Sequence, residues 1–531
     1  MTPALRPRPA PERRPDVLIV GGGAAGAVLA ARLSEDPGRD VLLLEAGPVP
    51  RSAADFGADL LDARLVPGAR PGRPGTVLYD VRLTPERPWA VVRGRILGGS
   101  TTVNGGYFIR ARRLDFDRWA AAGNPAWAYD RALPSLRAME TDLDLGAGRL
   151  HGGDGPVRVA RTGWEHPAAE AFRAAALAVG HQQDPDKNDP AAPPGIGPVP
   201  TNSVAGVRHN TALTYLTAQV RSRPNLRVRG GSAVVRVSIT SGRATGVVLA
   251  DGSELHAGEV VLCAGALASA HLLLLSGIGP RADLARAGVP IVRDAPAVGS
   301  AVSDHPQVVL DWAPMRDFPD PRENWLGGCL HLASGVGEFG VAGGPGDVEI
   351  LQSLVPMAGL MNGRAGAAGQ PLPFLVAAQA PCRSGRLRLV SADPEILPAV
   401  DFGYLAGPEQ RARMRAAVTA AATVLTSTAM AAFGRPGPDF PGTRILGRAV
   451  ELDRWIAENL GTAQHTCGTV PMGHADDPEH AAVDQRGRVH GVAALRVADA
   501  SILPDAPLRG PANTAVLIGE IIADAMRRAL P

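Results

Sequence analysis

The N-terminal part of the chain carries short apolar runs separated by a glycine-rich turn. Residues 16–20 contain a continuous apolar run from Val17 to Val20, which is typical of a buried parallel strand. The glycine-rich stretch 21–26 follows, and the small residues of 27–33 indicate a helix. A second apolar run at 41–44 predicts another buried strand, which ends at Glu45. This order of strand, turn, helix and strand predicts a parallel sheet in an α/β protein.

The middle of the chain has a different pattern. Polar helical segments such as 115–139 and a glycine-rich stretch at 335–369 separate the apolar runs. Residues 384–389 alternate between polar and apolar side chains and lead into the turn residues 391–394, a strand followed by a turn. Residues 410–425 combine arginine and alanine with apolar positions, which indicates a helix. These elements predict a second domain beside the parallel sheet.

The first turn, Gly21-Gly22-Gly23-Ala24-Ala25-Gly26, fits the pattern G-x-G-x-x-G. Gly21 permits the tight turn, Gly23 lets a pyrophosphate approach the backbone, and Gly26 lets helix and strand pack closely. The helix N-terminus adds N–H groups and a positive dipole end. Glu45, about 20 residues further on, is placed to accept ribose hydroxyls, which favours FAD or NAD over NADP. An ordinary glycine-rich turn is the alternative, and the full order of elements disfavours it.

Composition narrows the functions that remain. The 531 residues are enough for two or more domains. A formal net charge of +2 and an aromatic content of 4% disfavour nucleic-acid binding. Lys187 is the single lysine and lies in a turn that we expect to be exposed, so the chain has neither a P-loop nor a lysine for Schiff-base chemistry. Because arginine stays protonated, a base must come from His, Asp, Glu, Tyr or Cys.

Cysteine spacing and the chain ends add further expectations. The cysteines show no zinc, iron–sulfur or redox-pair spacing, so we expect no metal site and reduced thiols; they are Cys263, Cys329, Cys382 and Cys467. Proline and arginine dominate the start of the chain, which predicts a disordered arm at 1–11. The apolar stretches are too short to cross a bilayer. We therefore expect a cytoplasmic protein, and peripheral contact with the inner face of the membrane stays open.

A second glycine-rich loop surrounds Arg95 at 94–106 and offers many backbone N–H groups to a ligand. This loop resembles the first signature of the glucose–methanol–choline (GMC) oxidoreductases, a family of flavoproteins. Residues 265–279 resemble the second signature, with Ala270 where the family usually has Pro or Ser. Further similarity follows in order along the C-terminal part, at 465–473, 483–484, 495–501 and 510–514. The resemblance runs from about residue 16 to the C-terminus.

The resemblance implies FAD and a mixed fold, α/β in a Rossmann-like FAD-binding domain and α+β overall. That domain is then assembled from discontinuous segments, which we place at 12–50, 90–112, 200–305 and 455–531. A substrate-binding domain with an antiparallel sheet and helices, and the connecting segments, take 51–89, 113–199 and 306–454. In some relatives a histidine before the loop asparagine binds the flavin covalently. This chain has Val103 there, so we expect non-covalent FAD.

The resemblance and the first turn together predict the FAD contacts. They lie in the two glycine-rich loops, at the acidic strand end, at a strand residue similar to the family's adenine contact, and in the later motifs. They are Gly21, Gly23, Ala24, Ala25, Gly26, Glu45, Ala46, Arg95, Gly98, Gly99, Ser100, Asn104, Gly105, Val234, Ala264, Gly265, Asp499, Ala500 and Thr514.

The catalytic residues also come from the resemblance, because the chain has 12 histidines and residue type selects none of them. Oxidising an alcohol needs a base for the hydroxyl proton while a hydride moves to flavin N5. His465 opens the motif H-x-x-G-T-x-x-M-G and resembles the family's catalytic histidine. Asn513 matches the second active-site position, His or Asn, where an amide can hold the substrate oxygen. A helix is expected directly after Asn513, so a helix N-cap is its alternative role.

Three other motifs receive structural interpretations. Cys467 has no readable activating partner and is expected to be a buried thiol. For Asp304-His305-Pro306 a functional role is an alternative, and a turn at a domain boundary is the favoured interpretation. The acidic stretch 476–480 is expected to be a solvated loop rather than a metal site.

These observations predict FAD-dependent oxidation of an alcohol to a carbonyl. The order of the C-terminal motifs and the chain length most resemble the bacterial branch associated with mycofactocin, a peptide-derived redox cofactor. The donor is therefore expected to be a reduced cofactor of that type or a primary alcohol, and oxygen, a quinone or another carrier stays open as the electron acceptor. Two alternatives remain: a hydroxynitrile lyase on the same flavin scaffold, and an electron-transfer partner that feeds a respiratory carrier.

Overall fold

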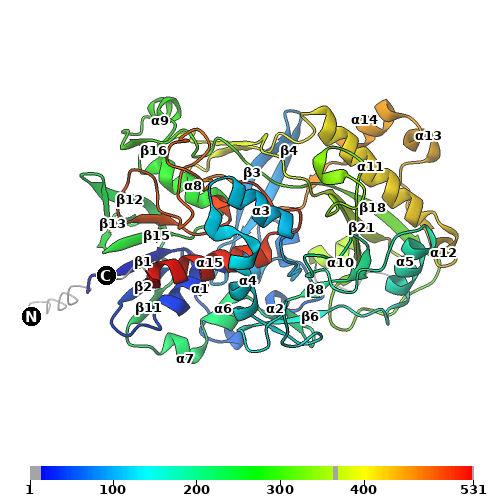
Figure 1. The fold of residues 1–531 in the computed structure, drawn as a ribbon, viewed down its shortest axis with the longest axis horizontal. Coiled ribbons are helices and arrows are strands. Elements are labelled where there is room, and N and C mark those ends of the chain that lie inside the picture. Colours follow the sequence, from blue (N-terminus) through cyan, green and yellow to red (C-terminus); the bar gives the residue numbers. More distant parts are fainter. Residues whose placement is uncertain (1–12, 363–368, 529–531) are drawn as a thin grey trace, which may run out of the picture.

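A computed structural model describes residues 13–362 and 369–528, and the arm predicted at 1–11 lies outside them. A parallel sheet occupies one side of the molecule, with strand order β11-β2-β1-β15-β26 (Figure 1). Its strands are β1 (Val17–Val20), β2 (Val41–Leu44), β11 (Leu226–Arg229), β15 (Glu259–Leu262) and β26 (Leu495–Val497). β1 and β2 are fully buried, as their continuous apolar runs predict. The sheet is assembled from segments far apart in the chain.

Helix α1 (Ala24–Leu33) packs against α15 (Ala512–Arg528) beside this sheet. The two helices approach closely at Gly519, where a Cβ atom would lie only 2.6 Å from the Cβ of Val28. The same core includes α3 (Arg113–Ala121) and α4 (Tyr129–Ala138). Phe116 and Trp119 of α3 pack edge to face with each other, and Trp119 packs in the same way with Trp127 of the 3-10 turn between the two helices. The helical prediction for 115–139 is confirmed. The division of the chain into two domains stays a prediction.

An antiparallel sheet occupies the opposite side, with order β24-β18-β21-β20-β19-β7 and β25 beside the start of β18 (Figure 1). One face packs against helices, and the other carries Cys329, Leu351 and Leu375 beside Tyr107. The strands are β7 (Ile196–Pro198), β18 (Pro306–Pro314), β19 (Leu326–Leu332), β20 (Val348–Ser353), β21 (Leu372–Ala378), β24 (Gly434–Pro436) and β25 (Gly461–Thr462). The helices are α5 (Pro167–Ala178), α11 (Pro408–Leu425), α12 (Thr428–Ala431) and α14 (Ala449–Asn459). Helix α11 confirms the helix predicted at 410–425.

A four-stranded sheet, β22-β23-β3-β4, contains the hairpin of β3 (Thr76–Thr84) and β4 (Arg87–Gly94). β22 (Arg386–Arg388) pairs with β23 (Ala399–Asp401) and lies inside the predicted strand 384–389. The smaller strands are β5 (Glu140–Asp142), β6 (Val157–Arg161), β8 (Pro200–Thr201), β9 (Ser203–Val204), β10 (Val207–Arg208), β12 (Val234–Thr240), β13 (Arg243–Leu249), β14 (Glu254–His256), β16 (Ile278–Gly279) and β17 (Arg293–Asp294). The remaining α-helices are α2 (Ala58–Leu61), α6 (Thr211–Tyr215), α7 (Ala218–Arg221), α8 (Ala266–Leu275), α9 (Arg281–Ala287), α10 (Met357–Asn362) and α13 (Thr443–Leu446).

The expected exposure of Lys187 is wrong. The side chain is buried, its Nζ lies 3.0 Å from Oδ2 of Asp184, and it also donates to the carbonyl oxygen of Gly195. Burial lowers the pKa of Lys187. The turn folds inward because Asp184 and the carbonyl group of Gly195 bind the ammonium group inside the protein. The polar sequence of the turn did not show these contacts.

Within residues 13–362 and 369–528, no helix has the length and apolar character needed to cross a membrane.

Candidate active site

Glycine-rich segments meet at the carboxyl ends of β1, β2 and β15, where parallel α/β sheets bind nucleotides. The N–H of Gly21 donates to the carbonyl oxygen of Leu44 at 2.7 Å, and the N–H of Gly98 donates to that of Gly22, also at 2.7 Å. Gly21 has φ +99°, and a Cβ there would lie 2.6 Å from the carbonyl oxygen of Cys263. The first turn, the second loop and the end of β15 therefore touch one another only because these positions lack side chains.

Glu45 closes the end of β2 and is buried. Its Oε2 accepts the N–H of Gly22 and its Oε1 accepts the N–H of Gly47, both at 2.9 Å. Burial is the largest influence and raises the pKa of Glu45, while these two N–H groups and Arg95 act to lower it. A carboxylate has further lone pairs, so Glu45 both fixes the turn and retains acceptor capacity for a ribose. Ala46 follows it directly, and Arg95 is exposed beside it.

The second loop forms a short 3-10 helix at Gly99–Thr102. A Cβ on Gly99 would lie 2.7 Å from the Cα of Gly23, so this loop rests on the first turn. Ser100 is exposed and its Oγ accepts the N–H of Gly94 at 3.2 Å. The carbonyl oxygen of Gly105 accepts the indole N–H of Trp325 at 2.8 Å. Asn104 is partly buried, and its Oδ1 accepts the N–H of Gly106 at 3.0 Å.

Asp499 ties the C-terminal motifs to this region. Its Oδ2 accepts the N–H of Gly265 at 2.9 Å and the hydroxyl of Ser269 at 2.5 Å, at the start of α8. Its Oδ1 accepts the N–H of Ser501. Burial raises its pKa, and these hydrogen bonds act to lower it. The structure thus shows Asp499 holding the 264–265 and 499–501 segments together, and its direct contact with FAD, like that of Ala264 and Ala500, stays a prediction.

The other predicted contacts lie on nearby elements. Ala24 and Ala25 begin α1, and Gly26 lies in its first turn against the carbonyl oxygen of Gly21. Val234 begins β12, two residues after Ser232, whose N–H donates to the carbonyl oxygen of Glu45 at 2.9 Å. Thr514 lies in the first turn of α15.

His465 follows β25 and is held by Asp304 and His305. Its backbone N–H donates to Oδ1 of Asp304 at 2.9 Å, and its Nδ1 lies 2.9 Å from Nδ1 of His305. Burial is the largest influence and lowers the pKa of His465 to about 4; the charge of Asp304 opposes this and Arg93 adds to it. Burial and His465 lower the pKa of His305 well below its ordinary value. Both rings are therefore neutral near pH 7.

Asp304 and His305 contribute to this site, which supports the functional alternative for 304–306. Asp304 and His305 are buried at the start of β18, where β18 pairs with β25 at 461–462, just before His465. Both oxygens of Asp304 accept hydrogen bonds, including the hydroxyl of Thr466 at 2.6 Å. Sequence reasoning left this role as the less favoured alternative because it depends on two strands that begin 155 positions apart, at 306 and 461.

Asn513 is not a helix N-cap. It lies inside α15, which begins at Ala512, and its side chain is fully buried. Its Oδ1 and Nδ2, and the hydroxyl of Thr514, have no hydrogen-bond partner within the described part of the chain. Buried polar atoms are almost always paired. Two neighbouring residues with unpaired polar atoms at the start of a helix are therefore suited to binding a cofactor or a donor.

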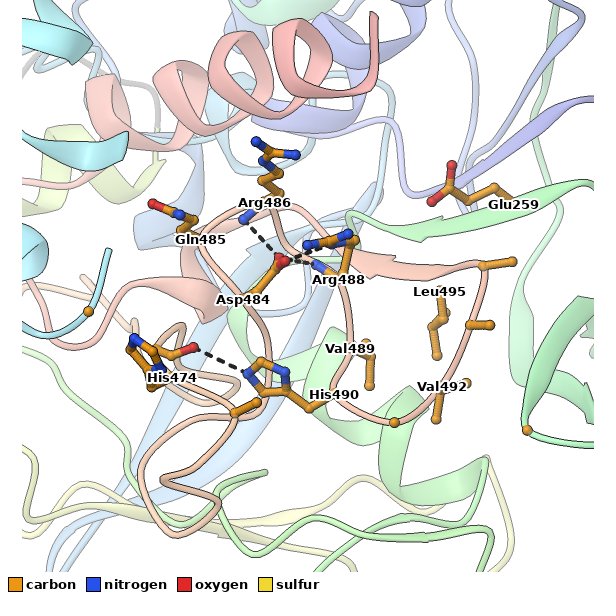
Figure 2. Close-up of a pocket in the computed structure, with 17 residues that line it drawn as sticks. Glu259, His474, Asp484, Gln485, Arg486, Arg488, Val489, His490, Val492 and Leu495 are labelled. Carbon is orange, nitrogen blue, oxygen red and sulfur yellow. Dashed lines mark hydrogen bonds and ion pairs between the residues drawn. The ribbon is translucent and has the colours of Figure 1, made fainter. Parts of the chain in front are cut away.

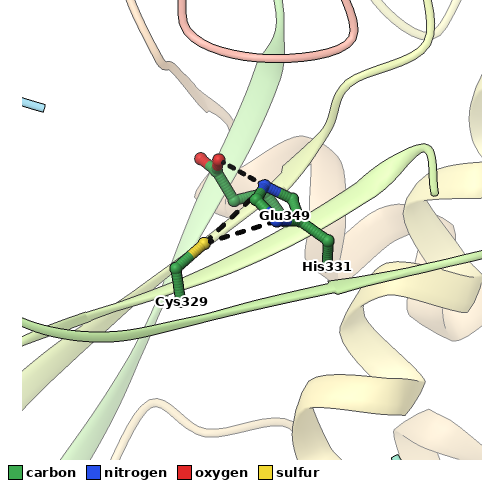
Figure 3. Close-up of side chains that lie close together, drawn as sticks. All are labelled: Cys329, His331 and Glu349. Carbon is green, nitrogen blue, oxygen red and sulfur yellow. Dashed lines mark hydrogen bonds and ion pairs between the residues drawn. The ribbon is translucent and has the colours of Figure 1, made fainter. Parts of the chain in front are cut away.

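Tyr107 connects the second loop to the antiparallel sheet. Its hydroxyl donates to Oε2 of Glu349 at 3.0 Å, which also lies 3.0 Å from Nε2 of His331. Oε1 of Glu349 accepts the amide of Gln379 at 3.0 Å. Figure 3 shows His331 and Cys329 side by side on β19, facing Glu349 on β20. Burial raises the pKa of Glu349, and Arg509 and Tyr107 act to lower it.

The set of Cys329, His331 and Glu349 has the residue types of a metal site. However, both oxygens of Glu349 already accept hydrogen bonds. The positive charges of Arg509 and Lys187 act on His331 and oppose a bound cation. We therefore interpret these residues as a hydrogen-bond network that holds Tyr107, a role that no sequence pattern indicated.

The comparisons with known proteins decide the family. The family described as GMC oxidoreductase matches residues 15–307 with its N-terminal part and 381–519 with its C-terminal part. The chain belongs to the GMC oxidoreductase family.

Relatives of this GMC oxidoreductase match it over nearly its whole length. An uncharacterized GMC-type oxidoreductase of the thcA 5' region of Rhodococcus erythropolis is 39% identical and covers 95% of this chain and 97% of its own. The 5-(hydroxymethyl)furfural oxidase of Methylovorus sp. (strain MP688) is 33% identical, with 96% and 98% covered. The crystal structure of pyridoxine 4-oxidase from Mesorbium loti aligns with a TM-score of 0.88 at 30% identity over 97% of this chain and 100% of that one. The predicted FAD-dependent oxidoreductase acting on alcohol-type donors is confirmed at this level.

The residues present fit FAD, the cofactor of this family. The glycine contacts leave a cradle lined by backbone, and the unpaired atoms of Asn513 and Thr514 face no protein partner among the described residues. The N-terminus of α1 follows the first turn directly and suits a pyrophosphate. Val103 offers no atom for covalent attachment to a flavin, so non-covalent FAD stays our prediction.

The pocket of Figure 2 is separate from this site. It is lined by residues of the 473–495 region with Gly123, Gly242 and Glu259, and none of the predicted site residues takes part. Glu259 and Leu495 are the first residues of β15 and β26, so the pocket lies at the amino ends of the parallel strands. Nucleotides bind at the opposite ends.

An ionic network around His151 predicts how stability depends on pH. Nδ1 of His151 lies 3.0 Å from both Glu140 and Asp142, and its Nε2 lies 2.9 Å from Asp186. Burial acts to lower its pKa, but the hydrogen bonds to the three carboxylates outweigh burial and raise it to about 10. This contribution is complete below the unfolded value of about 6.5 and is lost as pH rises through about 10.

We expect His151→Gln to lower the free energy of unfolding by about 3 kcal/mol below pH 6.5, because it removes the cation from a buried network. The difference from wild type should shrink between pH 7 and pH 10, measured by chemical denaturation across that range. A constant difference would contradict the raised pKa of His151. His480→Gln is the matched control, since its side chain is 67% exposed and pairs with the exposed Asp477.

Proposed function

We propose that this chain oxidises a primary alcohol, with His465 as the base that takes the hydroxyl proton. The orientation of His465 carries this proposal: Asp304 holds its backbone and His305 occupies its Nδ1. A Cβ on Gly510 would lie 3.4 Å from Nε2 of His465 and 3.5 Å from its Cε1, so this edge of the ring faces Gly510. With Nδ1 carrying the ring hydrogen toward His305, Nε2 keeps its lone pair and can accept a proton.

The neighbouring groups support the charge that results from proton transfer. Asp304 is buried and accepts the N–H of His465, so its negative charge favours the imidazolium form. Nδ1 of His305 lies 2.9 Å from Nδ1 of His465 and is placed to accept the hydrogen that remains there. FAD held by the glycine-rich loops would supply the hydride-accepting chemistry of the reaction. The amide of Asn513 is proposed to hold the donor oxygen or the cofactor, because its two polar atoms have no partner among the described residues.

The names of the relatives favour a primary alcohol. 5-(Hydroxymethyl)furfural and pyridoxine both carry a hydroxymethyl group on a ring, and the two named enzymes are 33% and 30% identical to this chain over nearly its whole length. A reduced mycofactocin-type peptide cofactor remains the other proposed donor, and oxygen, a quinone or another carrier the acceptor. The enzyme is proposed to work in the cytoplasm.

Anaerobic mixing of the yellow holoenzyme with donors tests this function. We expect ring-borne primary alcohols to bleach the flavin absorbance in a single exponential phase. Reduced mycofactocin and a cyanohydrin are tested in parallel. If reduced mycofactocin bleaches the flavin and no simple alcohol does, the donor is the peptide cofactor. If a cyanohydrin is cleaved without bleaching, the enzyme is the alternative lyase. Reoxidation by oxygen or a quinone then identifies the acceptor. Flavin released into the supernatant by acid would support non-covalent attachment.

A further inference from the structure

Neither the backbone conformation nor the packing of protein atoms requires a glycine at position 510. Its φ is not among the positive values of the described residues, so the backbone imposes no need for glycine. A Cβ placed there would meet Nε2 and Cε1 of His465 at 3.4 and 3.5 Å and Cδ1 of Tyr107 at 3.8 Å. These are ordinary contact distances, so a methyl group would fit without displacing any protein atom.

The space that this methyl group would fill is the space in front of the proposed base. A donor hydroxyl must come within about 2.6–3.2 Å of the atom that takes its proton. A methyl carbon 3.4 Å from Nε2 and 3.5 Å from Cε1 of His465 stands beside this atom and narrows the space through which the alcohol oxygen and its carbon reach it.

Neither neighbour is free to move away from an added methyl group. Tyr107 is held through its hydroxyl by Glu349 at 3.0 Å, and the carbonyl of Gly105 close to it is held by Trp325 at 2.8 Å. His465 is held by Asp304 and His305, each at 2.9 Å. The gap between the ring edge of Tyr107 and Nε2 therefore keeps its width.

We propose that Gly510 is a specificity-determining residue, whose missing side chain leaves room beside Nε2 of His465 for the carbinol carbon of the donor. This inference rests on the proposed function. Tyr107, held in place by its hydrogen bond to Glu349, then forms the side of that space opposite His465. The donor class is an alcohol whose carbinol carbon has substituents small enough to lie between Tyr107 and His465.

The test compares wild type with Gly510→Ala in two assays on the holoenzyme. The first is the rate of flavin reduction by the primary alcohol that reduces wild type fastest, which should fall roughly 10- to 200-fold, the range for one misplaced methyl group. The second is the rate at which diethyl pyrocarbonate modifies His465, followed by peptide mass mapping. This rate should also fall, because the methyl group shields Nε2, while modification of exposed His480 stays unchanged.

Gly148→Ala is the matched control, because Gly148 is exposed and a Cβ there would meet nothing within 4 Å. Flavin content and thermal midpoint should match wild type in both variants. Reduction of Gly510→Ala within twofold of wild type would overturn the proposal, whatever the labelling rate. If no alcohol reduces wild type, the proposed function has failed. Slower labelling of His465 in the variant would then still show that residue 510 controls access to Nε2, and unchanged labelling would overturn that as well.

Discussion

His465→Ala should slow the reduction of the flavin by alcohol roughly 10²- to 10⁴-fold, the usual contribution of a positioned general base. Asp304 and His305 hold this histidine so that only its Nε2 is open to a donor. Removing the imidazole takes away the group that we propose to accept the hydroxyl proton. Stopped-flow absorbance under anaerobic conditions measures the effect directly.

The control for His465→Ala is His480→Ala, an exposed histidine on a solvated loop, which should reduce at the wild-type rate. The pH dependence is a second check. Because the pKa of His465 is lowered to about 4, the base stays neutral down to that pH. The wild-type rate should therefore be flat from pH 8 to about 5 and fall only below that. A His465→Ala enzyme that reduces as fast as wild type would rule out this base.

The parts of the fold that sequence predicted correctly are local. The apolar runs and the first turn determine β1, α1 and β2 because hydrophobic periodicity and glycine spacing act over a few residues. The helix at 410–425 follows from the same reasoning. The glycine-rich loops were also found, since a backbone cradle needs residues without side chains and these are visible in any single sequence.

The parts that sequence missed are long-range. Asp304 and His305 join His465 only because β18 pairs with β25, and Tyr107 meets Glu349 only because β20 lies beside the second loop. Lys187 looked solvated because its neighbours are charged, yet Asp184 turns inward to meet it. None of these contacts leaves a periodic signal in the chain. They are set by which strands pair, and a single sequence does not show that pairing.

Asp304→Asn should slow flavin reduction by about 30-fold while leaving the protein folded. Asp304 is buried, and among the described residues it forms no salt bridge with arginine or lysine, so its charge acts on the groups around it. The replacement amide keeps an oxygen for the N–H groups of His305 and His465, which lie 2.7 and 2.9 Å away. Loss of the charge removes about 2 kcal/mol of support for the imidazolium at an effective dielectric constant of about 20, and that is about 30-fold in rate.

The pH profile separates this electrostatic role from a purely structural one. The charge of Asp304 acts to raise the pKa of His465, so the substitution should move the fall in reduction rate to lower pH. A damaged fold would lower the rate at every pH without moving that point. His151→Gln is the control for general destabilisation, because His151 belongs to a separate network with Glu140, Asp142 and Asp186 and should keep the wild-type reduction rate. An Asp304→Asn profile that matches wild type in both rate and position would show that the carboxylate only shapes the loop around His465.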